Sequence, residues 1–192
     1  MAKIVIVVGN PLHDSYCEAL GKAYLRGAQG GGHEAKLFVL ASMTFDPILH
    51  EGYRRPQPLE PDLAVARHAF LACDHAVFIF PLWAGDMPAL MKGFFERVLQ
   101  PDLLAIQARG GKASWKVFKG KSARVIMTMG MPGWFYRWYF GAHALKLLRR
   151  NILHFMGIRP VRSTIYGMIE AAGDERRKAW LHEVELLGRA AG

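Results

Sequence analysis

The sequence predicts an α/β fold in which a parallel sheet of five strands lies between two layers of helices. Three observations predict it: strand-length apolar runs alternate with helical segments, several runs are rich in β-branched residues, and 192 residues suffice for one substantial core. Right-handed helical crossovers between parallel strands are the economical arrangement of such a chain. We therefore expect the strand order 2-1-3-4-5 in a single domain spanning residues 1–192.

The beginning of the chain supplies two strands and the helix between them. The continuous apolar run from Lys3 to Val8 is typical of a strand buried on both faces. A polar loop follows, and Asp14 or Ser15 can cap a helix that we expect at residues 16–29. Three consecutive glycines then end this helix, and the second strand follows at residues 35–40.

The remaining elements continue the alternation of helices and strands. Proline opens two of the predicted helices, at Pro61 and Pro88, where a missing amide costs nothing. We expect the remaining strands at residues 75–80, 124–129 and 161–166. We expect the remaining helices at residues 59–72, 88–99, 139–156 and 174–189. Two long connections remain, at residues 41–58 and 100–121. Long loops in compact domains are often functional.

Composition and charge narrow the classes of function. A hydrophobic content of 52% with 21% charged residues is typical of a folded globular domain, and the apolar runs are too short to cross a membrane. The net charge of +9 suits nucleic acid, an anionic membrane surface or anionic small ligands, but equally an ordinary solvated surface. Because no nucleic-acid-binding motif is present, we expect no nucleic-acid partner. Two cysteines and no signal peptide predict a cytoplasmic protein.

Two glycine-rich segments imitate nucleotide-binding motifs and are rejected. Gly120–Ser122 lacks the upstream glycine of a P-loop, because that position is Trp115, and it precedes a strand. Gly30–Ala35 fits a dinucleotide fingerprint by letter, but it follows a helix and enters a strand. The histidines are dispersed and no Cys/His spacing suits a metal, so we expect no metal site.

Three loops follow predicted strands at the carboxyl edge of the sheet, where open α/β folds bind their ligands. The first, residues 9–17, places hydroxyl and amide groups at the start of a helix, where a phosphate can be held, and His13 adds a donor. An ordinary capped helix explains this loop equally well. The second combines Pro81, Leu82 and Trp83 with Gly85 and suits a flat, apolar ligand. The third, residues 128–133, has two glycines that allow close approach.

An aromatic segment follows the third loop. Residues 134–140 contain six aromatic side chains in seven positions, more than one helix face can bury. A wall over a flat substrate, an oligomer contact and a membrane-touching surface are all compatible with it. Lys146, Arg149 and Arg150 follow closely, which keeps an anionic membrane surface among the alternatives.

The segment Phe80–Trp83, continued by Met87–Val98, resembles the NAD(P)H:quinone oxidoreductase family. This family of flavodoxin-like flavoproteins includes bacterial quinone reductases and ancillary proteins of potassium efflux. Ser15–Leu20, Phe45–Leu49 and Ile152–Gly157 also match, so the resemblance spans about residues 3–167. It implies a flavodoxin-like three-layer sandwich, a bound flavin (FMN in preference to FAD), NAD(P)H as co-substrate and a homodimer with active sites at the subunit interface.

The resemblance also implies site residues. The family's flavin contacts fall on Asn10, Ser15, Tyr16, Cys17, Pro81, Leu82, Trp83, Ala84, Gly85, Thr128, Met129, Gly130 and Tyr136. Tyr136 is expected to hydrogen-bond the flavin or the acceptor, and His143 is the candidate for the family's catalytic histidine. The chain departs from the family at Asn10 and Cys17, where histidine and asparagine are usual, and at Trp83, where glutamine is frequent.

The implied function is hydride transfer in two steps by an NAD(P)H dehydrogenase (quinone). NAD(P)H reduces the flavin and leaves, and a quinone-like acceptor then takes its place in a ping-pong sequence. Backbone amides of residues 82–85 are expected to stabilise negative charge on the flavin, with Trp83 and the rings of residues 134–140 as a stacking wall. The alternatives are a regulatory flavoprotein subunit of a membrane transporter and a nitro- or azo-reductase. An electron carrier fits poorly, because such proteins are usually acidic.

Overall fold

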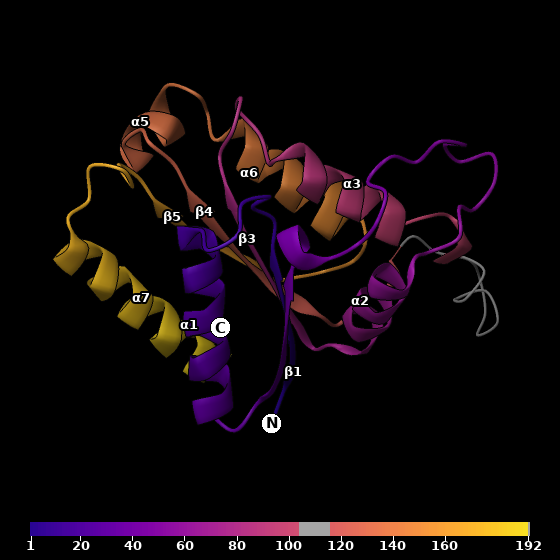
Figure 1. Ribbon diagram of the computed structural model, residues 1–192, viewed down its shortest axis with the longest axis horizontal. Helices are drawn as coiled ribbons and strands as arrows, with labels where there is room; N and C mark the ends of the chain where they lie inside the picture. Colours follow the sequence, from indigo (N-terminus) through magenta and orange to yellow (C-terminus); the bar gives the residue numbers. More distant parts are fainter. Residues whose placement is uncertain (104–115, 192) are drawn as a thin grey trace.

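The computed structural model describes residues 1–103 and 116–191. One parallel sheet with the order β2-β1-β3-β4-β5 crosses the molecule, and helices cover both of its faces (Figure 1). The predicted fold class and strand order are thereby confirmed. In the described part of the chain, no helix is long and apolar enough to cross a membrane.

The elements follow each other as the alternation of the sequence predicts. The strands are β1 (Lys3–Val8), β2 (Glu34–Val39), β3 (His75–Pro81), β4 (Ser122–Thr128) and β5 (Val161–Tyr166). The helices are α1 (Tyr16–Gly30), α2 (Pro61–Ala72), α3 (Ala89–Val98), α5 (Gly133–Trp138), α6 (His143–Leu147) and α7 (Asp174–Arg189). A 3₁₀ turn, η1 (Leu40–Ser42), follows β2, and a π-helical segment, η2 (Leu148–His154), continues α6.

Strand β3 is the centre of the sheet, and all of its residues are buried. It pairs in parallel with β1, Ile4 opposite His75, and with β4, Pro81 opposite Thr128. The carboxyl ends of β1, β3 and β4 therefore lie side by side. Because the strand order reverses between β1 and β3, this edge is the switch point at which doubly wound folds bind ligands.

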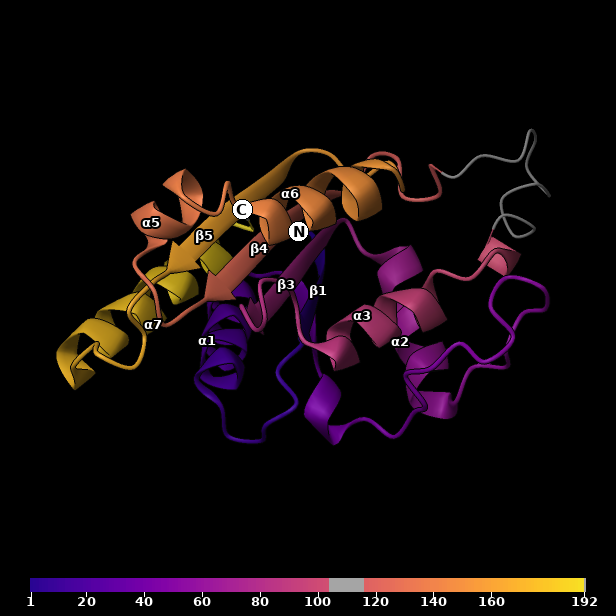
Figure 2. The same ribbon diagram turned by 90° about the horizontal axis from the view of Figure 1, so that it is seen from above.

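The two faces of the sheet carry separate cores. Helices α2, α3 and α6 with η2 cover one face, and α1 and α7 cover the other (Figure 2). Helices α1 and α7 approach so closely that a Cβ on Gly27 would lie 1.8 Å from the carbonyl oxygen of Glu185. A Cβ on Gly188 would lie 2.2 Å from the carbonyl oxygen of Tyr24. Two glycines, one from each helix, therefore permit this contact.

Of the helix predicted at residues 139–156, the structure confirms the part from His143 to His154, formed by α6 and η2, but the predicted start is wrong. Helix α5 begins earlier, after Pro132, and the chain then reverses at Gly141 and Ala142, which have φ angles of +58° and +51°. A left-handed pair cannot continue a right-handed helix, so α6 starts afresh at His143. The backbone N–H of Leu145 in the new helix donates to the Tyr136 hydroxyl at 3.3 Å.

The first long connection is fixed to α3 by a buried arginine. Arg97 is fully buried, and its guanidinium donates to the carbonyl oxygens of Asp46 and Pro58 and to the carboxylate of Glu60 at 2.8 Å. Residues 46–60 are thus held against α3 although they form no helix or strand of their own. Of the second predicted connection, 100–121, residues 104–115 lie outside the described part of the chain.

Candidate functional site

The loop between β1 and α1 caps its own helix. The Ser15 hydroxyl oxygen accepts a hydrogen bond from the Glu18 amide at 3.3 Å, and the Glu18 carboxylate accepts from the Asp14 amide at 3.0 Å. Lys22 pairs with Glu18 at 2.6 Å and, by its hydrogen bond, holds the pKa of that carboxyl below its usual range. The predicted phosphate site thus contains a carboxylate of the chain itself, partly neutralised by Lys22.

Cys17 connects the first loop to the end of β4. Its Sγ lies 3.4 Å from Oγ1 of Thr128, and both side chains are buried, as is that of Asn10. Burial raises the pKa of the Cys17 thiol, although the side chains of Thr128 and Asn10 favour the thiolate. The Asn10 Oδ1 accepts from the Leu12 amide at 3.0 Å. Three residues predicted for the cofactor site therefore meet, but in the interior.

The loop after β3 is a tight hairpin. Trp83 and Asp86 exchange two backbone hydrogen bonds of 2.9 Å, and Ala84 and Gly85 between them have φ angles of +47° and +84°. Positive φ at both central residues defines a type I′ turn. The Leu82 amide donates to the carbonyl oxygen of Thr128 at 2.8 Å. Of the four amides at residues 82–85 expected to face a flavin, those of Leu82 and Trp83 are therefore already engaged.

The free amides of this hairpin lie at its tip. Within the described part of the chain, neither the Ala84 amide nor the Gly85 amide has an acceptor, and both residues are exposed. Trp83 is 43% exposed beside them. Pro81, which precedes the hairpin, is buried at the end of β3. The hairpin thus presents two adjacent donors to whatever binds beside it.

The loop after β4 lies against the segment that follows β5. Met129 is buried, and its amide donates to the carbonyl oxygen of Tyr166 at 3.0 Å. Gly130 is exposed, and a Cβ there would lie 2.8 Å from Oε2 of Glu170. The carboxylate therefore occupies the space that a side chain at position 130 would need.

A cleft of about 510 Å³ opens between the hairpin and the segment after β4. Five of the residues that line it are predicted site residues, and they come from three separate stretches of the chain. The full lining is Leu82, Ala84, Gly85, Met131, Tyr136, Phe140 and His143. The loop between β1 and α1 contributes no residue to this described lining, so its predicted cofactor contacts stay predictions.

Tyr136 is the buried wall of the cleft. It is 2% exposed, and its hydroxyl oxygen accepts from the Leu145 amide, so its own proton remains available to donate. Burial raises the pKa of Tyr136. His143 is exposed at the rim, and its ring lies over Gly141, where a Cβ would approach Nε2 to 3.1 Å. The two predicted catalytic residues therefore share one cleft.

Other predicted residues point elsewhere. The Tyr16 hydroxyl donates to the carbonyl oxygen of Arg177 at 2.7 Å, which ties α1 to α7, and burial raises the pKa of Tyr16 to about 12. His13 Nδ1 lies 3.5 Å from the hydroxyl oxygen of Ser42 in η1. Of the expected stacking wall at residues 134–140, only Tyr136 and Phe140 line the cleft.

Sequence reasoning did not single out Met131 and Phe140 as site residues, although both lie in segments that it marked. Met131 follows the two predicted contacts Met129 and Gly130 directly, which is the signal that could have found it. Phe140 belongs to the aromatic segment expected as a stacking wall, but nothing in the sequence separates it from the rings of that segment that do not line the cleft. It faces the cleft only because the chain reverses at the next two residues.

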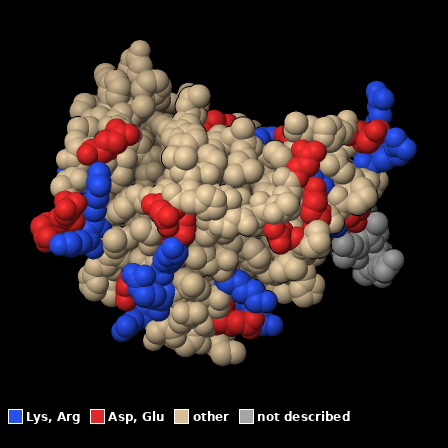
Figure 3. Space-filling model, viewed as in Figure 1, with Lys and Arg blue, Asp and Glu red and all other residues tan. Residues whose placement is uncertain are grey.

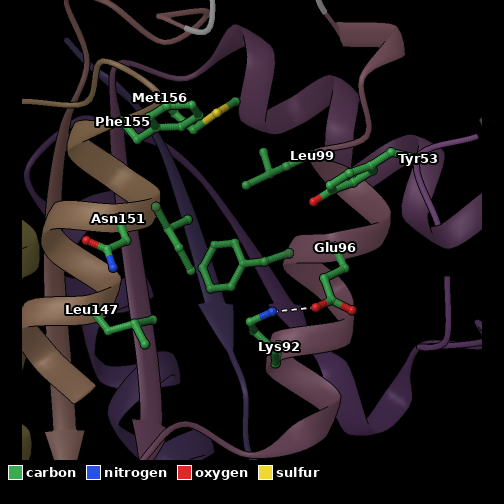
Figure 4. A pocket seen from close by; sticks show the side chains of 10 residues that line it. Tyr53, Lys92, Glu96, Leu99, Leu147, Asn151, Phe155 and Met156 are labelled. Atoms are coloured by element: carbon green, nitrogen blue, oxygen red, sulfur yellow. Dashed lines mark hydrogen bonds and ion pairs between the residues drawn. The ribbon is translucent and has the colours of Figure 1, made fainter. Parts of the chain in front are cut away.

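A second hollow, of about 320 Å³, lies between α3 and η2 and is shown in Figure 4. Lys92 and Glu96 form an ion pair on its α3 side, and Asn151 extends from η2 on the other (Figure 4). It contains none of the predicted cofactor residues. Among the described residues, no group of three or more His, Cys, Asp or Glu side chains is placed to hold a metal ion.

Comparison with known proteins places the chain in a family. Residues 2–186 match the family described as having a flavodoxin-like fold. The chain belongs to this flavodoxin-like family. The resemblance to NAD(P)H:quinone oxidoreductases is confirmed at the level of the family. An uncharacterised NAD(P)H oxidoreductase of Haemophilus influenzae is 29% identical over 146 residues, which cover 74% of this flavodoxin-like chain and 71% of that protein.

Solved structures share the flavodoxin-like fold over the whole chain. NAD(P)H:quinone oxidoreductase from Methanothermobacter marburgensis superposes with a TM-score of 0.79 at 23% identity, covering 98% of this chain and 96% of that one. An FMN-dependent NADH-azoreductase from Bacillus anthracis, solved in complex with FMN, superposes with a TM-score of 0.69 at 18% identity and covers 100% of both chains. At these identities the likeness establishes the fold.

Proposed function

We propose that this protein is a flavin-dependent NAD(P)H oxidoreductase that reduces a quinone or a similarly flat acceptor. The cleft between the hairpin and α5 carries the proposal, because it lies at the carboxyl edge of the sheet, after β3 and β4, and combines apolar walls with two free amides. The flavodoxin-like family and relatives named as NAD(P)H oxidoreductases and quinone dehydrogenases support it.

The chain's groups fit a flavin ring better than they fit its phosphate. The amides of Ala84 and Gly85 suit the carbonyl oxygens of an isoalloxazine, and Leu82, Met131 and Phe140 provide apolar surface around it. The phosphate would lie near the amino end of α1, where it must share the space with Glu18. We propose FMN in preference to FAD, and chromatography of the flavin released on denaturation distinguishes them.

When bound, the flavin supplies the chemistry of two-electron hydride transfer. The residues of the chain bind it, exclude water and hold protons. Tyr136 keeps a donatable proton on its hydroxyl at the cleft wall, because its oxygen is fixed by the Leu145 amide. His143, exposed at the rim, is a second proton source. In this proposal, Tyr136 and His143 protonate an acceptor that becomes negatively charged on reduction.

Absorption spectroscopy and steady-state kinetics test this function. The purified protein, as isolated or after adding FMN or FAD, should show the visible bands of a bound flavin. It should oxidise NADH or NADPH with menadione as acceptor and give parallel double-reciprocal lines, the signature of a ping-pong sequence. A colourless protein that binds neither flavin contradicts the proposal.

A cleft variant makes the test specific to the site. Leu82→Arg places a charge in the cleft and should abolish flavin binding. Val65→Arg is the matched control, because Val65 is 58% exposed on α2, away from the cleft. Equal loss of flavin in both variants contradicts the assignment of the cleft.

Two finer points belong to the same proposal. An azo dye or a nitroaromatic compound in place of menadione tests the reductase alternative, which the likeness to an azoreductase favours. We also propose a homodimer, and light scattering on the eluted protein measures it. A monomeric protein with full activity contradicts an active site shared between subunits.

A further inference from the structure

An exposed group of rings lies beside the cleft. We call Trp134, Trp138, Tyr139 and Phe140 the aromatic ridge; they are 69%, 78%, 66% and 42% exposed. Phe135 supports the ridge from below, stacked on Tyr139 with 5.1 Å between ring centroids and 5° between planes. Helix α5, which carries most of the ridge, projects from the carboxyl edge of the sheet (Figure 1). Exposed apolar patches of this kind mark interaction sites.

Along the sequence, the segment that carries the aromatic ridge has charges of one sign. Between Asp102 and Glu170 the chain contains no acidic residue and twelve lysines and arginines. In the part that the structure describes, four of these cations, between residues 137 and 150, are exposed and form no ion pair: Arg137, Lys146, Arg149 and Arg150. Figure 3 shows the projection formed by α5 without charged side chains on this face, with acidic groups beginning below it.

We propose that the aromatic ridge docks on the surface of an anionic lipid bilayer. Tryptophan and tyrosine favour the membrane–water interface, since their rings are apolar and their N–H or O–H groups stay hydrated. The exposed cations, Arg137 on the same helix and Lys146, Arg149 and Arg150 after it, would be attracted to anionic headgroups. On the ridge itself a second copy of this chain fits less well, because a two-fold interface centred there would bring like charges together; the proposed homodimer would then use another face of the molecule.

Docking by the ridge limits the class of molecules that can serve as the acceptor. This step rests on the proposed function. Phe140 belongs to the ridge and also lines the cleft, and Tyr136 of the same helix forms the cleft wall. A protein resting on the ridge would therefore hold the cleft close to the lipid headgroups. The substrate class that fits this placement is a long-chain quinone dissolved in the bilayer.

Vesicle sedimentation tests the docking. The wild-type protein should sediment with phosphatidylglycerol vesicles at low salt and remain in solution with phosphatidylcholine vesicles. Trp138→Ser should weaken the partitioning roughly tenfold through lost apolar burial. Arg149→Glu with Arg150→Glu should weaken it by at least about tenfold through lost attraction and added repulsion.

Two matched controls exclude general effects of removing rings or cations. Tyr53→Ser removes a ring that is 70% exposed on another part of the molecule, and Arg55→Glu reverses a cation whose side chain is 76% exposed. Both variants should sediment like the wild type. If the wild type stays in solution, or if Trp138→Ser and Tyr53→Ser sediment alike, the docking proposal is overturned. It is also overturned if Trp138→Ser dissociates an oligomer, because a second copy then covers the ridge.

Kinetics separate this proposal from the proposed function. Trp138→Ser should reduce menadione at the wild-type rate, because Trp138 does not line the cleft, but should lose most activity toward a long-chain quinone embedded in vesicles. A protein that reduces menadione without binding vesicles contradicts the docking alone. A protein that binds vesicles through the ridge but holds no flavin contradicts the proposed function and leaves the docking in place.

Discussion

Cys17 shows how one residue can connect the elements of the site from within. The family resemblance marks its position for a cofactor contact, yet its side chain is 2% exposed and faces Thr128 across the sheet edge. A thiol is smaller than the asparagine usual in the family and forms weaker hydrogen bonds. Its effect on a bound cofactor would therefore act through Thr128 and Asn10, whose loops it holds together.

Both cysteines should be unreactive in the folded protein. Burial raises the pKa of Cys17 and raises that of Cys73 to about 11, so both thiols remain protonated at about pH 8. At that pH, native protein should release no coloured thiolate rapidly from an aromatic disulfide reagent. After guanidinium is added, each protein molecule should release two equivalents of the coloured thiolate. A rapid reaction of the native protein would show that at least one of the two thiols is accessible.

The raised pKa values of the two thiols also affect stability. Because they favour the protonated thiols in the folded protein, the stability that they contribute is lost as the pH rises above about 9.

Arg97 is the second residue whose replacement has a defined consequence. Arg97→Met should lower the free energy of unfolding by about 3 kcal/mol, because it removes a buried cation and leaves carbonyl groups and Glu60 without their donor. Guanidinium unfolding measures the change. Arg55→Ala, which breaks an exposed ion pair with Glu51, should cost under about 0.5 kcal/mol. Equal losses would show that Arg97 contributes no more than a surface ion pair.

The stability that the contact between Arg97 and Glu60 contributes depends on pH. Burial is the largest single influence and acts to raise the pKa of Glu60, but the hydrogen bond from Arg97, the backbone hydrogen bonds and the charge of Arg97 together outweigh it, so the net pKa lies below the ordinary value. A carboxyl with a lowered folded pKa stabilises the protein above its unfolded pKa. The wild type should therefore lose stability relative to Arg97→Met as the pH falls through the pKa of Glu60.

At the scale of elements, the break between α5 and α6 shapes the cleft. An uninterrupted helix from residue 139 would carry Phe140 and His143 along one axis. The left-handed backbone at Gly141 and Ala142 instead folds α6 back, so that Tyr136, Phe140 and His143 converge. The hydrogen bond between Leu145 and Tyr136 is the contact that joins the two helices across this break.

Tyr136→Phe tests that contact. The ring stays packed, but the Leu145 amide loses its acceptor, which should cost about 1 kcal/mol and lower the Tm by roughly 2–4 °C. Thermal unfolding followed by circular dichroism provides the measurement. Tyr139→Phe removes a hydroxyl from a ring that is 66% exposed and should leave the Tm unchanged. A Tm of Tyr136→Phe equal to that of the wild type would mean that the contact contributes nothing.

At the scale of the whole molecule, the layer formed by α1 and α7 depends on close backbone contact. Gly27→Ala places a Cβ on the carbonyl oxygen of Glu185 and should destabilise the protein by roughly 1–3 kcal/mol, because the helices must separate. Gly30→Ala at the end of the same helix meets only Arg189 Nη2 at 3.6 Å and should be tolerated. Denaturant unfolding of the two variants distinguishes them, and similar midpoints would contradict the tight contact.

Local signals in the sequence predict the sheet and most of the helices. The run at residues 75–80 is so continuously apolar that β3 differs from the prediction only by including Pro81. The reversal at Ala142 has no such signal, since alanine rarely adopts positive φ, and the hydrogen bond from Tyr16 to Arg177 joins residues 161 positions apart. Long-range contacts of this kind decide which predicted side chains reach the cleft.

The pairing of α1 with α7 has a consequence for synthesis on the ribosome. One face of β1 is covered by α1 and α7. The apolar residues on this face are therefore fully covered only when α7, which begins 144 positions after α1 ends, has been synthesised. At about 5–20 residues per second, that delay lasts roughly seven to thirty seconds. During this interval the smaller of the two cores is incomplete, so its apolar residues stay exposed to solvent and to chaperones. The core on this face can therefore close only after α7 has been synthesised, while the face covered by α2 and α3 can begin to form earlier.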